Sequence, residues 1–189
     1  MTEKQKPSKE EEEYFLREDI EKELKLCRQK QLKVIQQRER TGIAKALNTS
    51  EAVADEAMKL GFDTDTARVL PLVPLIQAAW ADGKITNAET KKILEKATLF
   101  GIEADTPAST FLHLLVEENP TPLFFERVNV VIKEIVEENP GGEVSSNVLA
   151  WSKAVAEASG GFFGLKNPIH KKQQAVLDEL AALFGVQDV

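Results

Sequence analysis

Cysteine and long apolar runs are scarce in this sequence of 189 residues, and both shortages exclude classes of protein. The single cysteine, Cys27, cannot form a disulfide within the chain, which favours a reducing compartment. The longest apolar run, residues 69–81, contains two prolines and Gln77 and is well short of the roughly 20 residues that cross a bilayer. Residues 1–13 are charged and lack the apolar segment of a secretory signal. We therefore expect a cytoplasmic protein without a transmembrane segment.

The chain also lacks excess positive charge and a recognisable catalytic set. Its net charge of −7 repels a polyanion, so we expect no nucleic-acid partner. The two histidines, His113 and His170, lie far apart in the sequence, and with one cysteine they do not indicate a zinc site. Neither histidine can be paired with a nucleophile as its base. The sequence thus predicts a protein that is not an enzyme.

Helix-forming residues are abundant, and no alternating strand pattern is present. Residues 10–40 contain neither glycine nor proline and are rich in Glu, Lys, Arg, Gln and Leu, which predicts a long helix that ends at Gly42. Shorter helices follow, including one over residues 65–70. Five of them are expected to begin after a Ser or Thr cap, and these caps are Ser50, Thr64, Thr86, Thr106 and Thr121. The fold class is therefore predicted to be all-α.

Two segments of the chain resemble each other. Residues 93–102 and 177–186 share Glu, Ala, Leu-Phe-Gly and a final aliphatic residue at an offset of 84. Each would be the second helix of a helix pair joined by a glycine-bearing turn. A single pair cannot bury its apolar face, so we predict that the pairs over residues 64–102 and 143–187 pack together. The expected organisation is an N-terminal helical arm with a flexible tail (1–41) and a duplicated helical bundle (48–189).

The first predicted turn carries a family resemblance. Residues 80–89, Trp-Ala-Asp-Gly-Lys-Ile-Thr-Asn-Ala-Glu, and the helix that follows resemble the TerB-like family, known from tellurite resistance proteins. The resemblance covers about residues 64–189. It implies an all-α fold with a duplicated core, an association with stress responses and, in some members, a divalent metal held by acidic residues from both halves.

Asp82 and Glu89 are the candidate metal ligands, and they have two readings. They match the second half of an EF-hand loop, but Ala78 and Trp80 stand at its first ligand positions and offer no side-chain carboxylate. One reading is a metal shared with another acidic residue. The other is a capping box, in which Thr86 and Glu89 close the start of a helix. The second repeat has Gln173 in place of Glu89, which weighs against a metal bound by both halves. Beyond this possible metal, no cofactor is predicted.

The predicted N-terminal helix is the main candidate for an interaction surface. Its apolar residues Leu16, Ile20, Leu24, Cys27 and Val34 form a narrow stripe, interrupted by Gln31, that is typical of a coiled-coil seam or a docking helix. The candidate interaction residues here are Tyr14, Phe15, Ile20 and Leu24. The alternative is a charged arm that packs on the bundle. Phe162 and Phe163, between glycines, are a second candidate, with plugging of the core as the alternative.

A second resemblance falls on this helix. Glu12-Glu13-Tyr14-Phe15 and the charged residues behind it, over residues 12–26, are similar to a segment of the mitochondrial ATPase inhibitor protein, which implies inhibition of a rotary ATPase. Three functions are therefore open. The first is a non-enzymatic interaction or regulatory module of TerB-like type, which docks on a protein partner or a second copy through its N-terminal helix. The others are a metal-responsive stress protein and an ATPase inhibitor.

Overall fold

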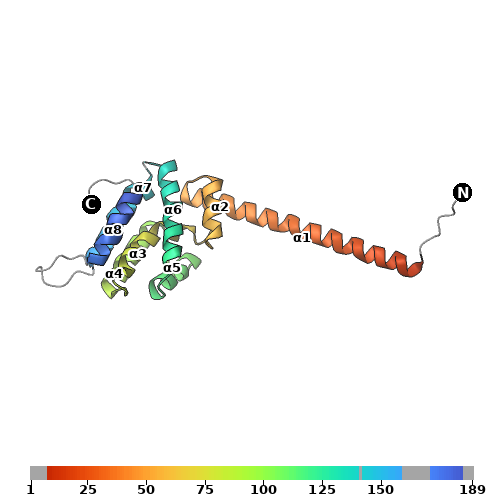
Figure 1. Cartoon of the computed structure of the whole chain (residues 1–189), viewed down its shortest axis with the longest axis horizontal. Helices are drawn as coiled ribbons and strands as arrows, with labels where there is room; N and C mark the ends of the chain where they lie inside the picture. Colours follow the sequence, from red (N-terminus) through yellow and green to blue (C-terminus); the bar gives the residue numbers. More distant parts are fainter. Residues whose placement is uncertain (1–7, 141, 159–170, 185–189) are drawn as a thin grey trace, which may run out of the picture. The chain divides into compact units, whose positions relative to one another are not determined.

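The computed structural model describes residues 8–140, 142–158 and 171–184, and this part of the chain is helical without any strand (Figure 1). The all-α prediction is therefore confirmed. No helix in the described ranges has an apolar stretch long enough to cross a lipid bilayer. The elements are α1 (Lys9–Leu47), α2 (Glu51–Lys59), the 3-10 helix η1 (Ala67–Leu72), α3 (Val73–Trp80), α4 (Asn87–Leu99), α5 (Pro107–Glu117), α6 (Pro122–Glu138), α7 (Glu143–Ala158) and α8 (Lys171–Phe184).

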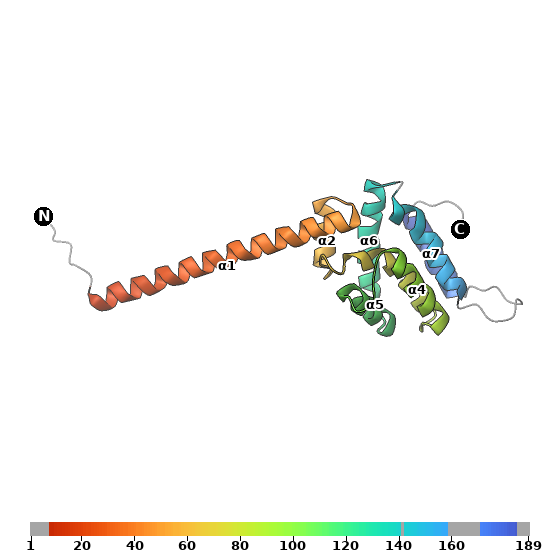
Figure 2. The ribbon, with the colours of Figure 1, turned by 180° about the vertical axis from the view of Figure 1, so that it is seen from behind.

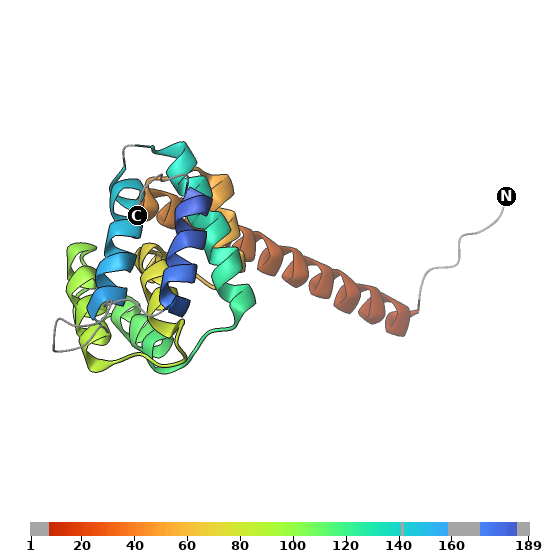
Figure 3. The same cartoon turned by 60° about the vertical axis from the view of Figure 1, so that its left-hand side comes forward.

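The chain divides into two compact units, residues 1–38 and residues 39–189. The second unit holds the hydrophobic core, and α3 is its central element. α3 packs against α4, α6, α7 and α8, and in Figure 3 it is seen behind and between α7 and α8. Its sequence, Val-Pro-Leu-Ile-Gln-Ala-Ala-Trp, has no charged residue, and its side chains are buried apart from those of Gln77 and Trp80. α4 and α7 lie side by side (Figure 2).

The predicted helix starts are confirmed in four places. The hydroxyls of Ser50, Thr86, Thr106 and Thr121 each accept a hydrogen bond from a backbone N–H three residues later, at 3.2–3.3 Å. These bonds satisfy backbone donors that have no partner within the helix. In α5 and α6 a proline follows the cap, where its missing N–H costs no hydrogen bond.

The prediction that the first helix ends at Gly42 is wrong. α1 continues to Leu47 and ends before Asn48, which takes the left-handed conformation with φ of 51°. A glycine inside a helix costs only about 1 kcal/mol relative to alanine. Burial of Ile43 and Leu47 in the core of the second unit outweighs that cost.

Thr64 was predicted to cap a helix over residues 65–70, and this prediction is also wrong. The side chain of Thr64 turns towards α1, where its hydroxyl donates a hydrogen bond of 2.7 Å to the carboxylate of Glu39. Helical structure begins later, as η1, after a turn in which Asp63 accepts hydrogen bonds from the N–H groups of Asp65 and Thr66. Thr64 therefore ties this turn to α1. This contact also explains the glycine at position 42, because a Cβ there would lie 2.2 Å from the Thr64 hydroxyl oxygen.

We predict that Gly42→Ala destabilises the protein by about 1–3 kcal/mol, although alanine favours a helix over glycine. The added methyl group would overlap the side chain of Thr64, whose Cβ lies only 3.0 Å from the new atom. Urea unfolding followed by circular dichroism measures the free energy. In the Thr64→Gly background, where the overlap is removed, the same substitution should stabilise the protein. Equal effects of Gly42→Ala in both backgrounds would contradict this account.

Candidate functional site

The turn predicted to hold a metal is a capping box built on a buried carboxylate. Glu89 is fully buried at the third position of α4. Its Oε2 accepts hydrogen bonds from the backbone N–H of Thr86 at 2.7 Å and from the Thr86 hydroxyl at 2.8 Å. The backbone N–H of Glu89 in turn donates to the Thr86 hydroxyl oxygen at 3.3 Å. The capping-box interpretation of Thr86 and Glu89 is therefore confirmed.

Glu89 also joins two helices. Its second oxygen, Oε1, accepts a hydrogen bond of 2.8 Å from the side-chain amide of Gln173 on α8, which is buried as well. The two residues that the repeat aligns thus contact each other directly. A buried polar group without a partner costs about 1–3 kcal/mol, so each of these side chains needs the other.

Burial raises the pKa of Glu89 above its usual range because it disfavours the charged form. The hydrogen bonds from Thr86 oppose this shift, and the nearby negative charge of Asp82 adds to it. The net result is a carboxyl group that ionises less readily than an exposed glutamate. Asp82 itself is half-buried, and its Oδ1 accepts a hydrogen bond of 3.3 Å from the backbone N–H of Lys84.

Within the described residues, no three His, Cys, Asp or Glu side chains converge in a way that could hold a metal ion. The side chain that meets Glu89 is the amide of Gln173 and not a third carboxylate. Both oxygens of Glu89 already accept hydrogen bonds from protein groups. A divalent cation at Asp82 and Glu89 stays a prediction, and it would have to displace at least one of these donors.

The predicted interaction residues of α1 are exposed. Tyr14, Phe15, Ile20 and Leu24 retain between 48% and 65% of their accessible surface. Leu16 and Val34, on the same predicted stripe, are exposed too, and so is Ile35, which the predicted stripe does not include and which lies at its edge with 56% of its surface accessible. A full count of apolar positions around the helix would have found it. The other predicted pair, Phe162 and Phe163, lies outside the described residues.

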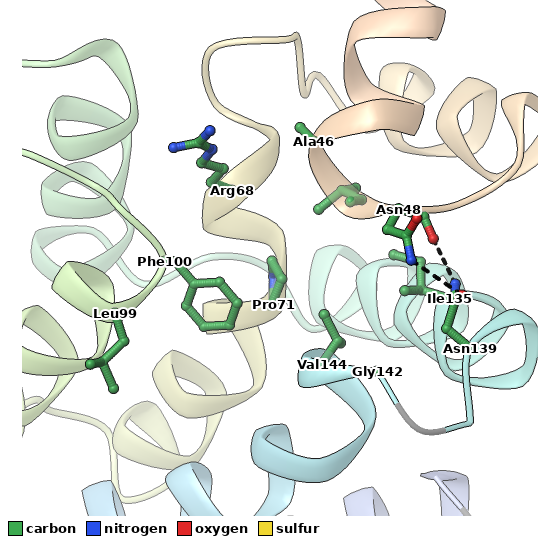
Figure 4. A pocket seen from close by; sticks show the side chains of 11 residues that line it. Ala46, Asn48, Arg68, Pro71, Leu99, Phe100, Ile135, Asn139, Gly142 and Val144 are labelled. Atoms are coloured by element: carbon green, nitrogen blue, oxygen red, sulfur yellow. Dashed lines mark hydrogen bonds between the residues drawn. The ribbon is translucent and has the colours of Figure 1, made fainter.

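A cavity of about 390 Å³ lies in the second unit, where the end of α1, η1, the end of α4, α6 and the start of α7 meet (Figure 4). Pro71, Phe100 and Val144 contribute apolar walls, and the side chains of Asn48 and Asn139 are hydrogen-bonded to each other at 3.3 Å on its polar side. Its described lining contains no hydroxyl, thiol, imidazole or carboxylate side chain, so it offers no reactive group. No local sequence pattern predicts this cavity, because its lining comes from elements far apart along the chain.

No protein-family model matches the chain, and neither curated proteins nor solved structures provide a match.

We predict that Glu89→Gln changes the pH dependence of stability. Because the pKa of Glu89 is raised, the folded state holds its proton more tightly than the unfolded state. The contribution of Glu89 to stability is therefore fully present in acid and is lost as the pH rises from the usual 4.5 through the raised value. The unfolding free energy of the wild type minus that of Glu89→Gln should therefore decrease as the pH rises from 4.5 through the raised pKa of Glu89.

Glu95→Gln is the matched control for this measurement. A hydrogen bond from Lys92 lowers the pKa of the exposed Glu95 carboxyl, so its difference curve should have the opposite sign and a smaller amplitude. Glu89→Ala should cost about 2–4 kcal/mol in acid and less as the pH rises, since it removes the cap and leaves the buried amide of Gln173 without this acceptor. A flat difference curve for Glu89→Gln would show that the carboxyl titrates normally.

Proposed function

We propose that this chain is a non-enzymatic interaction module of TerB-like type, in which the helical bundle is the body and residues 9–38 of α1 dock on a protein partner or on a second copy. The observation that carries the proposal is the row of exposed apolar side chains on this segment. Nine of the thirteen exposed large hydrophobic side chains among the described residues lie between Tyr14 and Ile35.

Such a concentration of apolar surface favours association. Burying a large aliphatic or aromatic side chain contributes roughly 1.5–3 kcal/mol, so even a few of these residues covered by another helix supply useful affinity. Exposed apolar side chains scattered singly need no explanation, whereas the stripe that Leu16, Ile20, Leu24 and Val34 form on one face of the helix indicates a binding surface. The charged residues between them keep the segment in solution until it is covered.

The arrangement of α4 and α8 supports the TerB-like part of the proposal. Ile93 on α4 and Leu177 on α8, which are 84 positions apart as in the sequence repeat, are both fully buried. Glu89 and Gln173 have the same offset and are hydrogen-bonded to each other. Two copies of one helix pair, packed face to face, would produce this correspondence.

The metal-responsive alternative keeps one supporting observation, a buried carboxylate near Asp82. It predicts that titration of chelator-treated protein with Ca²⁺, Mg²⁺, Mn²⁺ or Zn²⁺ in a calorimeter releases or absorbs heat and raises the melting temperature. Asp82→Asn should abolish both effects while leaving the hydrogen bonds of Glu89 in place. If the wild type shows no heat and no shift with any of the four ions, the alternative is removed.

For the docking proposal we predict different outcomes for two neighbouring leucines of α1. Leu24 and Leu26 are 53% and 51% exposed, but they lie about 200° apart around the helix, so only Leu24 belongs to the stripe. Leu24→Glu should weaken association at least about tenfold, since it places a charge on the buried side of the complex. Leu26→Glu introduces the same charge two residues away and should have little effect.

Sedimentation equilibrium of the full chain measures self-association, and co-purification with quantification of captured proteins measures hetero-association. Circular dichroism confirms that both variants remain helical. Equal behaviour of Leu24→Glu and Leu26→Glu in both assays would remove the basis of the proposal.

A further inference from the structure

The exposed segment of α1 has its charges separated by sign. Residues 9–23 contain eight acidic and three basic residues, a net charge of −5, whereas residues 24–38 contain five basic residues and no acidic one, a net charge of +5. Acidic residues near a helix N-terminus and basic residues near its C-terminus favour the helix itself, but that effect falls off within one turn at each end. It does not account for separation over 30 residues. Two such helices attract each other when they lie antiparallel and repel each other when they lie parallel.

The apolar stripe on the same segment fits a heptad. Ile20, Cys27 and Val34 are spaced by seven residues, and Leu24 and Gln31 alternate with them at the same spacing. These are the a and d positions of a coiled coil, with Leu24 and Gln31 at a and the other three at d. Ile20, Leu24 and Val34 are 48–68% exposed and Cys27 is exposed. Over residues 20–34 the seam is therefore short, free in the described chain and interrupted by one polar residue, Gln31, and the a position that precedes residue 20 holds Arg17.

Resting on the proposed docking role of α1, we infer that the partner is a second copy of this chain, bound through an antiparallel coiled coil of residues 13–38. In an antiparallel pair each a residue faces a d residue of the other helix. The register that centres the seam places Leu24 beside Cys27 of the second copy and Ile20 beside Gln31. It also places Arg17 beside Val34 and Glu13 beside Arg38, so the outermost layer pairs opposite charges.

The residues that flank the seam select this register. In antiparallel coils e residues face e residues and g residues face g residues. Here Glu21 meets Arg28 of the second copy and Glu23 meets Lys30, and the twofold symmetry makes each pair twice. A shift by one heptad in either direction brings together identical charges at these positions, either the two glutamates with themselves or Arg28 and Lys30 with themselves. Of the centred antiparallel register and the two registers one heptad away from it, only the centred one therefore pairs opposite charges at the e and g positions.

The same register accounts for two further exposed apolar residues. Tyr14 and Ile35 both occupy e positions, and the pairing brings Tyr14 of one copy against Ile35 of the other. Within the described chain, no ion pair involves Glu21, Glu23, Arg28 or Lys30. All four are therefore available to pair with a second copy. Phe15, Leu26 and Leu32 lie outside this seam.

A charge-swap series in the full chain tests the inference by sedimentation equilibrium at low salt. Glu21→Lys and Arg28→Glu should each raise the dissociation constant of the dimer about tenfold, because each reverses two flanking contacts. The double variant Glu21→Lys/Arg28→Glu restores opposite charges and should return the constant to that of the wild type. In a parallel coil Glu21 would face an apolar residue and Arg28 would face Glu23, so the double variant would stay weak.

Disulfide trapping gives the orientation independently. A Leu24→Cys/Cys27→Ser variant mixed with the wild type should form a mixed disulfide dimer readily, because residues 24 and 27 share a layer only in the antiparallel pair. Each protein alone should cross-link more slowly. Faster cross-linking of the wild type with itself would overturn the antiparallel arrangement.

The outcomes separate this inference from the proposed function. A wild-type chain that stays monomeric up to about 1 mM, or a dimer that none of the charge variants weakens, overturns the antiparallel dimer. In the first case the docking role would still stand if Leu24→Glu, and not Leu26→Glu, abolished binding to another protein. Identical behaviour of those two variants in every assay would instead remove the docking role.

Discussion

Helix α3 carries no charged side chain and is buried over most of its length, so the rest of residues 39–189 is organised by the need to cover it. An element that is apolar on all sides is stable only when other elements surround it. Four helices pack directly on α3, and each brings an apolar face of its own. The short α3 therefore determines how many helices the body needs. It also explains why residues from positions 43 to 180 belong to its core.

Two hydrogen bonds between buried or half-buried side chains join helices across this core, and they restrict how the helices pack. The amide of Asn129 on α6 donates a hydrogen bond of 2.7 Å to Gln77 on α3, while Gln173 on α8 donates to Glu89 on α4. Apolar contacts alone permit small rotations and shifts between helices, whereas a buried hydrogen bond is lost if the two groups separate. These hydrogen bonds thus restrict the relative positions of the helices, while apolar burial supplies most of the stability of the core.

Most of the helical architecture could be read from local signals, and the failures have a common physical cause. Caps such as Thr86 and Thr121 act through bonds to residues three positions away, so the sequence contains the whole interaction. Gly42 and Thr64 were misjudged because each is governed by the other across 22 residues, a contact that no local pattern reveals. The capping box at Glu89 was predictable for the same reason as the other caps. The hydrogen bond between Glu89 and Gln173 was indicated only by the alignment of the two repeats. The cavity beside Asn48 could not be predicted from any local pattern.

Residues 9–38 are stabilised as a helix by other interactions than the rest of α1. The segment beyond it, residues 39–47, is fixed by burial of Ile43 and Leu47 and by the ion pair of 2.7 Å between Arg40 and Asp55. Residues 9–38 have to stay helical by composition, by acidic residues at the N-terminus and by local pairs such as Glu18 with Lys22. A segment that is helical before it binds loses little conformational freedom on binding. For that reason a short seam would be sufficient for the proposed antiparallel dimer, and the distribution of charge, which adds little affinity by itself, would select the orientation of the second copy.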